Sequence, residues 1–403
     1  MLLRESLFAH QEGRLEDAER GYLGLLAEEP RNPDALHFLG MLCFQQGRPD
    51  ESERLIRASL EIRPDNPHAW NNLGNVLFIQ ERFDDAVDAY LHAVDADIEL
   101  GAAWRNLGQC LERSASPEQA IALFRRIIET LPGFVPAYEA LGRILRVVGR
   151  HEGAIEVYRR WVELEPDRPT ARHMLAAVTN EGVPDKADAA YVRETFDAFA
   201  DVFDEKLERL KYRAPRLLIE RVETLVGSPT GALHILDAGC GTGWCGPLLR
   251  PFASRLVGVD LSGGMLERAR QRGCYDALAQ NELAAYMHSA ESSFDGILSA
   301  DTLCYFGSLD EVLQAARRAL RDDGWLAFTV EHWSSKSPSE SFRIEPHGRY
   351  AHTATYVGEV LQRSGFAVQR MDEVVLREEL FQDVPGLAVV ARPLPDTAKG
   401  EVN

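Results

Sequence analysis

Small and apolar residues recur along the first 167 residues at a fixed step of 34. Small residues occupy one series of equivalent positions, namely Ala18, Ser52, Ala86, Ala120 and Ala154. Large apolar residues occupy the series four positions later, namely Tyr22, Ile56, Tyr90, Phe124 and Tyr158. Positions four apart share one face of a helix, so the pattern predicts helices that approach closely at the small residues. The large residues are expected to fill the space between successive units.

Two further series on the same step mark where these helices touch and where they end. Leu-Gly pairs begin at Leu39, Leu73, Leu107 and Leu141, and prolines stand at Pro30, Pro64, Pro132 and Pro166. Glycine permits close contact between helix backbones, and proline stops a helix. We therefore predict five units of two antiparallel helices, the first one incomplete, and a capping helix over 169–180. Together they form an all-α solenoid over residues 1–182.

Past residue 182 the hydrophobic pattern changes from repeats to strands that alternate with helices. Residues 181–189 are polar with helix breakers and predict a linker, and the helical spacing of Phe196, Phe199 and Phe203 predicts a helical lead-in over 190–226. Apolar runs then predict strands near 233–236, 255–260, 275–279, 294–301, 324–331, 365–370 and 386–392. This alternation predicts an α/β domain with a doubly wound sheet over 190–393, before a disordered tail over 394–403.

A Gly-rich turn follows the first of these strands. Asp237 ends the strand, and Gly239, Gly241 and Gly243 follow in G-x-G-x-G spacing. Glycines at this place lay the backbone open to a ligand at the carboxyl end of the strand. A dinucleotide-binding turn needs its third glycine where this chain has Trp244. The turn therefore favours another nucleoside ligand.

An acidic residue also ends the second strand. Asp260 stands 21 residues after Gly239, where a carboxylate suits the two hydroxyls of a ribose. Together with the Gly-rich turn, this strand end forms a motif that resembles the class I S-adenosylmethionine-dependent methyltransferases. The motif includes the run from Val259 to Ser262 and Met265. This resemblance implies S-adenosylmethionine as the cofactor and a Rossmann-like sheet of seven strands whose last strand is antiparallel.

The solenoid and the lead-in sharpen this resemblance. The 34-residue repeats resemble tetratricopeptide repeats. The lead-in over 191–215 and the run from Gly348 to His352 are similar to a bacterial group of predicted methyltransferases that carry such repeats. The resemblance covers nearly the whole chain and leaves the methyl acceptor open.

The resemblance also implies which residues contact the cofactor. The three glycines would approach the methionine moiety, Asp237 would orient the loop or the ligand's ammonium group, and Asp260 would bind the ribose. Residues expected near the adenine are Leu261, Met265, Glu282 and Leu283, with Asp276 as the alternative to Glu282. A lid over the cofactor could be formed by Phe203, Asp204 and Tyr212, although Phe203 could equally pack in the core.

Methyl transfer needs alignment and exclusion of water, and it needs a base only when the acceptor arrives protonated. Asp301 and Tyr305 follow the fourth strand, where we expect contact with the cofactor or the substrate. Glu331 and His332 end the fifth strand and are candidate bases. The long Ser-rich segment behind them is a plausible substrate loop that holds His347, Tyr350 and His352.

The composition limits which binding partners and which cellular compartment we expect. Lys and Arg number 44 against 63 Asp and Glu, a net charge of −19, and a nucleic acid partner is therefore not expected. Six scattered cysteines without a CxxC pair predict free thiols, no disulfide framework and no metal site. The N-terminus lacks an apolar signal region and no run is long enough to span a bilayer, so we expect a cytoplasmic protein.

Three functions fit these observations. The first is a methyltransferase whose repeats bind a protein or peptide that the second domain methylates. The second is a small-molecule methyltransferase with regulatory repeats, and the third is a non-enzymatic scaffold that senses the cofactor. A homo-oligomer is compatible with each of them.

Overall fold

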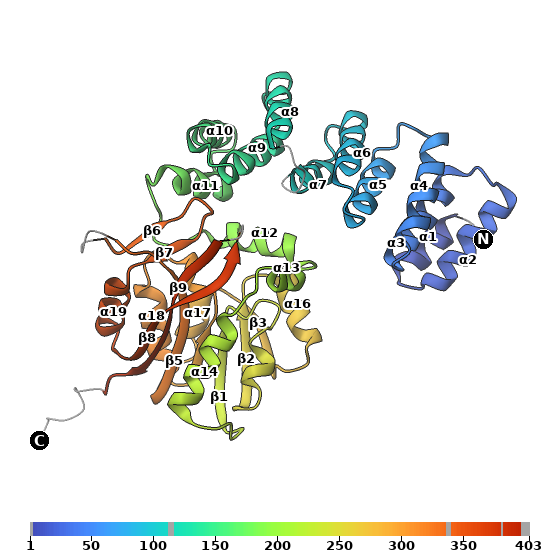
Figure 1. The fold of residues 1–403 in the computed structure, drawn as a ribbon. Coiled ribbons are helices and arrows are strands. Elements are labelled where there is room, and N and C mark those ends of the chain that lie inside the picture. Colours follow the sequence, from blue (N-terminus) through green and yellow to red (C-terminus); the bar gives the residue numbers. More distant parts are fainter. Residues whose placement is uncertain (1–2, 112–116, 336–339, 380–381, 396–403) are drawn as a thin grey trace, which may run out of the picture. The chain divides into compact units, whose positions relative to one another are not determined.

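The computed structural model describes residues 3–111, 117–335, 340–379 and 382–395, which fall into two compact units divided between Pro166 and Asp167 (Figure 1). The predicted tail lies outside the described residues from residue 396 onwards. None of the helices that the structure describes is long and apolar enough to cross a membrane.

The first unit consists of helices in consecutive antiparallel pairs, as the repeats predict. Their bounds are α1 Leu3–Gln11, α2 Leu15–Glu28, α3 Pro33–Gln45, α4 Pro49–Ile62, α5 Pro67–Ile79, α6 Phe83–Ala96, α7 Gly101–Leu111, α8 Pro117–Thr130, α9 Val135–Val147 and α10 His151–Leu164. Proline begins several of them at a position where its missing N–H costs nothing. Before α3 the side chain of Asn32 caps the helix, because its Oδ1 accepts a hydrogen bond from Ala35 N at 3.0 Å.

The two repeat series that the sequence displays meet each other in space. A Cβ at Gly74 would lie 2.4 Å from the ring of Tyr90, and a Cβ at Gly142 would lie 2.2 Å from the ring of Tyr158. Both pairs join the two helices of one unit. Any side chain larger than glycine would force the helix pair apart. Tyr22 of the same series also packs between units, as expected, because its ring stacks on Phe38 of the next unit with 6.2 Å between centroids.

The second unit begins with four helices. They are α11 Pro169–Thr179, α12 Ala189–Phe199, α13 Phe203–Arg209 and α14 Ala214–Val226. Helix α11, predicted as a solenoid cap, contacts this unit: His173 Nε2 lies 2.7 Å from Gly348 O, and its ring stacks on Tyr191 with 4.3 Å between centroids. The predicted domain boundaries near 182 and 190 stay predictions.

One sheet organises the rest of this unit, in the order β3-β2-β1-β4-β5 with β9 beside β5 and β8 beside β9. The strands are β1 Leu233–Ala238, β2 Ala253–Asp260, β3 Ala277–Gln280, β4 Phe294–Ser299, β5 Leu320–His332, β6 Phe342–Ile344, β7 Tyr350–His352, β8 Phe366–Glu379 and β9 Gln382–Pro393. Strands β1 to β5 are parallel and β9 runs antiparallel to β5. The predicted doubly wound, Rossmann-like sheet with an antiparallel last strand is confirmed.

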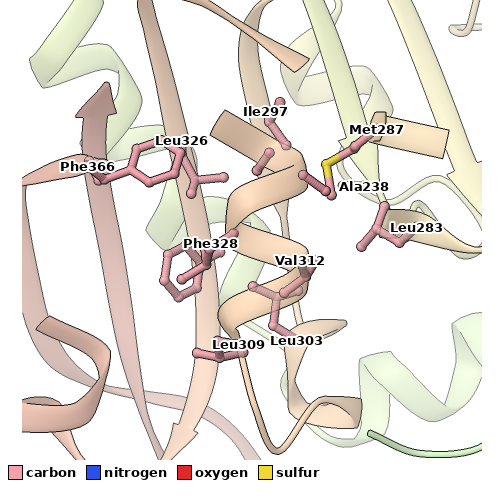
Figure 2. Close-up of a cluster of buried hydrophobic side chains, with 14 of the residues drawn as sticks. Ala238, Leu283, Met287, Ile297, Leu303, Leu309, Val312, Leu326, Phe328 and Phe366 are labelled. Carbon is pink, nitrogen blue, oxygen red and sulfur yellow. The ribbon is translucent and has the colours of Figure 1, made fainter. Parts of the chain in front are cut away.

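Helices cover both faces of this sheet. The remaining helices are α15 Gly246–Leu249, α16 Gly263–Gln271, α17 Leu283–His288, η1 Leu303–Tyr305, α18 Asp310–Ala319 and α19 Ala354–Arg363. On one face, Ile297 and Phe328 pack against Met287 of α17 and Val312 of α18 (Figure 2). On the other, strand residues pack against α14. Each fully buried side chain of this kind contributes about 1.5–3 kcal/mol.

A hairpin replaces part of the predicted Ser-rich loop. Strand β6 pairs with β7, and β7 pairs in parallel with the end of β5, where Glu331 lies opposite Ala351 and His332 opposite His352. Strands of three residues carry too little alternation to be seen in a sequence. The pairing of β7 with the end of β5 places the β6–β7 turn at the carboxyl edge of the sheet.

Candidate functional site

The Gly-rich turn lies between β1 and α15, at the carboxyl edge of the parallel strands. Gly239, Gly241 and Gly243 have φ values of 77°, 54° and 87°, which residues with a side chain rarely adopt. A Cβ at Gly239 would lie 2.2 Å from Thr302 Oγ1, and a Cβ at Gly243 would lie 3.0 Å from a tyrosine ring. At Gly241 the nearest such atom is Cε1 of Phe203 at 3.9 Å. Of the three glycines, Gly241 therefore leaves the most room for a ligand.

The carboxylate of Asp260 is fixed by backbone amides at the end of β2. Gly241 N donates to Oδ2 and Ser262 N donates to Oδ1, each at 2.9 Å. Burial raises the pKa of Asp260, and these amides oppose that shift. The side chain remains half-buried, so its lone pairs can still accept hydrogen bonds from a ligand.

Asp237 lies beneath this turn and is 1% exposed. Its Oδ2 accepts a hydrogen bond from Tyr275 at 2.6 Å, and no described residue donates to Oδ1. Burial raises the pKa of Asp237 to about 7, although the bond from Tyr275 lowers it. An unpartnered buried oxygen at this place fits a hydrogen-bond donor supplied from outside the protein.

The helical lead-in is bound to the two loops of the site. Asp204 Oδ1 accepts hydrogen bonds from Thr242 Oγ1 at 2.5 Å and Trp244 Nε1 at 2.7 Å. Asp197 of α12 accepts one from Ser262 Oγ at 2.5 Å. The ring of Tyr212 contacts Trp244 edge-on at 6.2 Å. Helices α12 and α13 thus lie against the turn after β1 and the loop after β2, although their role as a lid stays a prediction.

The residues expected near an adenine differ in exposure. Met265 is fully buried by the protein itself, Leu283 is 7% exposed, and Leu261 is half-buried. Glu282 follows the carboxyl end of β3 and caps α17, because its Oε2 accepts a hydrogen bond from Ala285 N at 2.8 Å.

The alternative residue, Asp276, lies at the opposite, amino end of β3. It precedes β3 and accepts hydrogen bonds from Leu256 N and Arg250 Nη1, both at 2.7 Å. Asp276 and Glu282 thus lie at opposite ends of β3, and the choice between them stays a prediction.

Glu331 lies at the end of β5 between two arginines and is 3% exposed. Its Oε1 accepts hydrogen bonds from Arg349 Nε at 2.6 Å and from Arg377 Nη2, and its Oε2 lies 3.4 Å from His347 Nε2. Burial would raise the pKa of Glu331, but these two arginines and His347 lower it below its ordinary value. The carboxylate is thereby held in its charged form.

His332, the other candidate base at this strand end, points to the opposite face, because side chains alternate along a strand. Its Nδ1 lies 3.0 Å from the carbonyl oxygen of His352, and its Nε2 lies 3.5 Å from the exposed Glu373. The structure therefore does not bring the side chains of His332 and Glu331 together.

Asp301 and Tyr305 follow β4 at the same edge. Asp301 has a φ of 56°, its N–H donates to Thr329 Oγ1 at 2.9 Å, and its Oδ2 accepts a hydrogen bond from Arg377 Nη1 at 2.5 Å. The ring of Tyr305 lies edge-on to Phe196 at 5.5 Å, and burial raises its pKa well above 10, so it remains a neutral phenol. Thr302, between them, packs on Gly239 and joins this loop to the Gly-rich turn.

Of the histidines in the expected substrate loop, His347 alone faces Glu331. His352 is fully buried, and its Nε2 lies 3.0 Å from Gly307 O. Tyr350 is also fully buried, and its hydroxyl donates to Pro184 O at 2.9 Å. These two residues build the base of the β6–β7 hairpin.

Four residues that shape this edge were not among the predicted site residues. They are Tyr275, Arg349, Arg377 and Glu379. Arg377 and Glu379 belong to the part of β8 beyond the predicted strand, and a charged residue in a strand usually faces solvent. Only the pairing of β8 with β9 turns them towards Glu331.

Comparisons with known proteins find similar families for both units. Residues 236–328 match the family model described as a methyltransferase domain, and residues 31–99, 65–132 and 135–178 match models of the tetratricopeptide repeat. Methyltransferase-like protein 27 of Homo sapiens is 39% identical over 125 residues, which cover 30% of this chain and 49% of that protein. Malonyl-[acyl-carrier protein] O-methyltransferase of Erwinia pyrifoliae is 33% identical over 128 residues, which cover 30% and 48%.

The chain spans about half the length of these curated relatives. Among solved structures, an S-adenosylmethionine dependent methyltransferase from Mesorhizobium loti is similar with a TM-score of 0.34 and 25% identity, covering 43% of this chain and 96% of that one.

Proposed function

Because the chain combines tetratricopeptide repeats over 31–178 with a class I S-adenosylmethionine-dependent methyltransferase domain over 236–328, we propose that it transfers a methyl group from S-adenosylmethionine to an acceptor bound by the same chain. The observation that carries the proposal is the geometry around Gly241. Its backbone is open on the ligand side, and its amide fixes the carboxylate of Asp260.

The residues present fit this cofactor. Asp260 would accept hydrogen bonds from the ribose hydroxyls, and the unpartnered Oδ1 of Asp237 would face the ammonium group or a loop donor. The backbone at Gly239, Gly241 and Gly243 would pass along the methionine moiety. Residues proposed to lie by the adenine are Leu261, Met265, Glu282 and Leu283. Asp301 would contact either the cofactor or the acceptor.

When bound, S-adenosylmethionine supplies a methyl group already activated on a sulfonium sulfur. The protein therefore contributes position and a dry site more than acid–base chemistry. Asp204 and Asp197 hold the lead-in helices against the two loops and would exclude water there. Where the acceptor arrives protonated, candidates to take or hold the proton include Glu331, His332 and Tyr305.

We propose that the acceptor is a protein or peptide recruited by the repeats, because a tetratricopeptide solenoid offers an extended surface for a chain segment. A small-molecule acceptor is the second candidate. It is favoured by the relatives named malonyl-[acyl-carrier protein] O-methyltransferase, a name that gives a malonyl group as the methyl acceptor. The acidic composition disfavours a nucleic acid, and six free thiols favour a reducing, cytoplasmic compartment.

Two measurements test the proposal. Titration calorimetry of the full chain with S-adenosylmethionine should give saturable one-site binding, and no binding would refute it. Methyl-labelled S-adenosylmethionine is then added to an extract from cells that lack the protein. Label that enters protein supports the first candidate, and label that enters only small molecules supports the second.

A further inference from the structure

Charged side chains gather at the carboxyl ends of β4 and β5, beside the Gly-rich turn. They come from the β4–η1 loop, β5, the β6–β7 turn and β8. We name them the β5-end cluster, whose members are Asp301, Glu331, His347, Arg349, Arg377 and Glu379. The cluster adjoins the cofactor loop, because Thr302, next to Asp301, donates a hydrogen bond to Gly239 O at 3.1 Å.

The arginines of this cluster are already occupied by carboxylates. Arg377 is 3% exposed, and each of its three nitrogens donates to a different acid: Nη1 to Asp301, Nη2 to Glu331 and Nε to Glu379. Arg349 donates from Nε to Glu331 at 2.6 Å and from Nη2 to both oxygens of Glu379. A carboxylate acceptor would have to displace one of these buried ion pairs, which is costly.

The cluster carries an excess of negative charge. Three carboxylates face two guanidinium groups, and burial lowers the pKa of His347 to about 4, which leaves it neutral near pH 7. The two arginines outweigh burial and bring the pKa of Glu379 to about 2, so its charge persists. A cationic or neutral group is therefore favoured at this edge over an anion.

One oxygen of the cluster has no partner. Asp301 Oδ2 is bonded to Arg377, but no described residue donates to Oδ1, although this atom is buried. The side chain of Asp301 is 17% exposed, and its backbone is held at a φ of 56° by Thr329. A buried carboxylate oxygen left without a donor in the free protein fits a donor on a bound molecule.

We propose, building on the methyltransferase function above, that Asp301 Oδ1 binds the methyl acceptor through the hydrogen on its nucleophilic atom. The acceptor is accordingly a neutral or cationic N–H or O–H compound, and not a carboxylate. In the transfer, a neutral acceptor forms the new bond to the methyl carbon with the lone pair of its nitrogen or oxygen, whereas an ammonium acceptor first loses a proton to Asp301 Oδ1 and thereby frees that lone pair. The carbon–sulfur bond breaks and its electron pair stays on sulfur, while the acceptor proton passes to Asp301 Oδ1 and then to water.

Groups around Asp301 suit the uptake of that proton. Burial raises the pKa of Asp301, and Arg377 opposes this shift. The other titratable groups that face it are Glu331, Arg349, Glu379, Cys304 and Tyr212. The pKa of Tyr212 is raised well above 10 by burial first and by Asp301 second, so this tyrosine does not compete for the proton.

The alkali stability of the product tests the acceptor class on the unaltered protein. The probe is methyl-labelled S-adenosylmethionine with the full chain, in an extract from cells that lack it, supplemented with amines, alcohols and carboxylic acids. Methyl groups on nitrogen or on an alcohol oxygen survive alkali, whereas carboxyl methyl esters release volatile methanol. Label that survives and lies on nitrogen or on an alcohol oxygen supports the proposal, and label on carbon or sulfur overturns it. Label released as methanol, or no label in any compound although S-adenosylmethionine binds, overturns it.

The variant Asp301→Asn tests the residue itself. Loss of its carboxylate should lower methyl transfer about 100-fold or more, while the affinity for S-adenosylmethionine stays within about 3-fold. The matched control is Asp322→Asn, at the amino end of β5, where the side chain is 77% exposed. It should change neither methyl transfer nor the affinity for S-adenosylmethionine. Full transfer by Asp301→Asn, or loss of cofactor affinity in it, overturns the assignment. Failure of the wild type to bind S-adenosylmethionine would instead refute the methyltransferase function.

Discussion

Gly241 and Asp260 hold each other in place: the glycine N–H donates a hydrogen bond to Asp260 Oδ2 at 2.9 Å. The second oxygen of Asp260 accepts a bond of the same length from Ser262 N. The carboxylate therefore organises the turn after β1 and the loop after β2 before any ligand binds. In such a preorganised site the cofactor does not have to order the loops itself.

Asp260→Ala should weaken S-adenosylmethionine binding by about 10- to 100-fold. A hydrogen bond to a charged group contributes about 1.5–3 kcal/mol, and 1.4 kcal/mol corresponds to tenfold in affinity. Calorimetry measures the effect. Asp276→Asn serves as the control, because Asp276 pairs with Arg250 before β3. This variant should bind S-adenosylmethionine with the affinity of the wild type. Equal affinities for Asp260→Ala and the wild type would contradict the ribose role.

Replacing Gly239 by alanine should mainly reduce stability, whereas replacing Gly241 by alanine should mainly reduce S-adenosylmethionine affinity. At Gly239 the new Cβ would lie 2.2 Å from Thr302, so Gly239→Ala should lower the free energy of unfolding by more than 2 kcal/mol, roughly the cost of overpacking. At Gly241 the space is open, and only the positive φ costs about 1 kcal/mol. Gly241→Ala should instead mainly reduce S-adenosylmethionine affinity. Urea unfolding and calorimetry on both variants separate the two effects.

Stability should depend on pH through Asp237. Its pKa is raised from 3.8 to about 7 in the folded protein, so the folded state binds the proton more tightly than the unfolded state. This contribution is fully present below pH 3.8 and is lost as the pH rises to about 7, by up to about 4 kcal/mol. The free energy of unfolding of the wild type, relative to that of Asp237→Asn, should therefore be higher at about pH 5 than at about pH 8 when both are measured by urea unfolding.

Tyr275→Phe is the companion variant for this measurement. It removes the hydrogen bond that lowers the pKa of Asp237, so the pH dependence should steepen. A flat difference between wild type and Asp237→Asn across this range would show that Asp237 titrates as an ordinary carboxyl group.

A fragment that begins at Asp167 should fold and bind S-adenosylmethionine. Helix α11 belongs to this unit through His173, which contacts Gly348 O and the ring of Tyr191. A fragment that begins after α11, at Val183, leaves Gly348 O without this partner and should unfold at a lower temperature. Circular dichroism melts compare the two. Equal melting temperatures would show that α11 contributes nothing to the second unit.

Local patterns in the sequence determined the elements and the cofactor side of the site. The 34-residue step determined the helix pairs, because each unit repeats the same short-range packing of a glycine against a large residue, as at Gly74 and Tyr90. The Gly-rich turn and Asp260 could be predicted because both lie at the ends of predicted strands, and parallel strands bring their carboxyl ends to one edge of the sheet.

Only the tertiary structure decided what surrounds the proposed acceptor side. Arg377 lies on β8 and Asp301 after β4, and no short-range pattern links two residues 76 positions apart. Their ion pair forms because β8 pairs with β9 and β9 with β5, which carries a buried charge to the end of β5. The same pairing separates His332 from Glu331, since neighbouring residues of a strand face opposite sides. The sequence thus determined the strand ends where we propose that the cofactor binds, and long-range strand pairing decided which charges meet beside them.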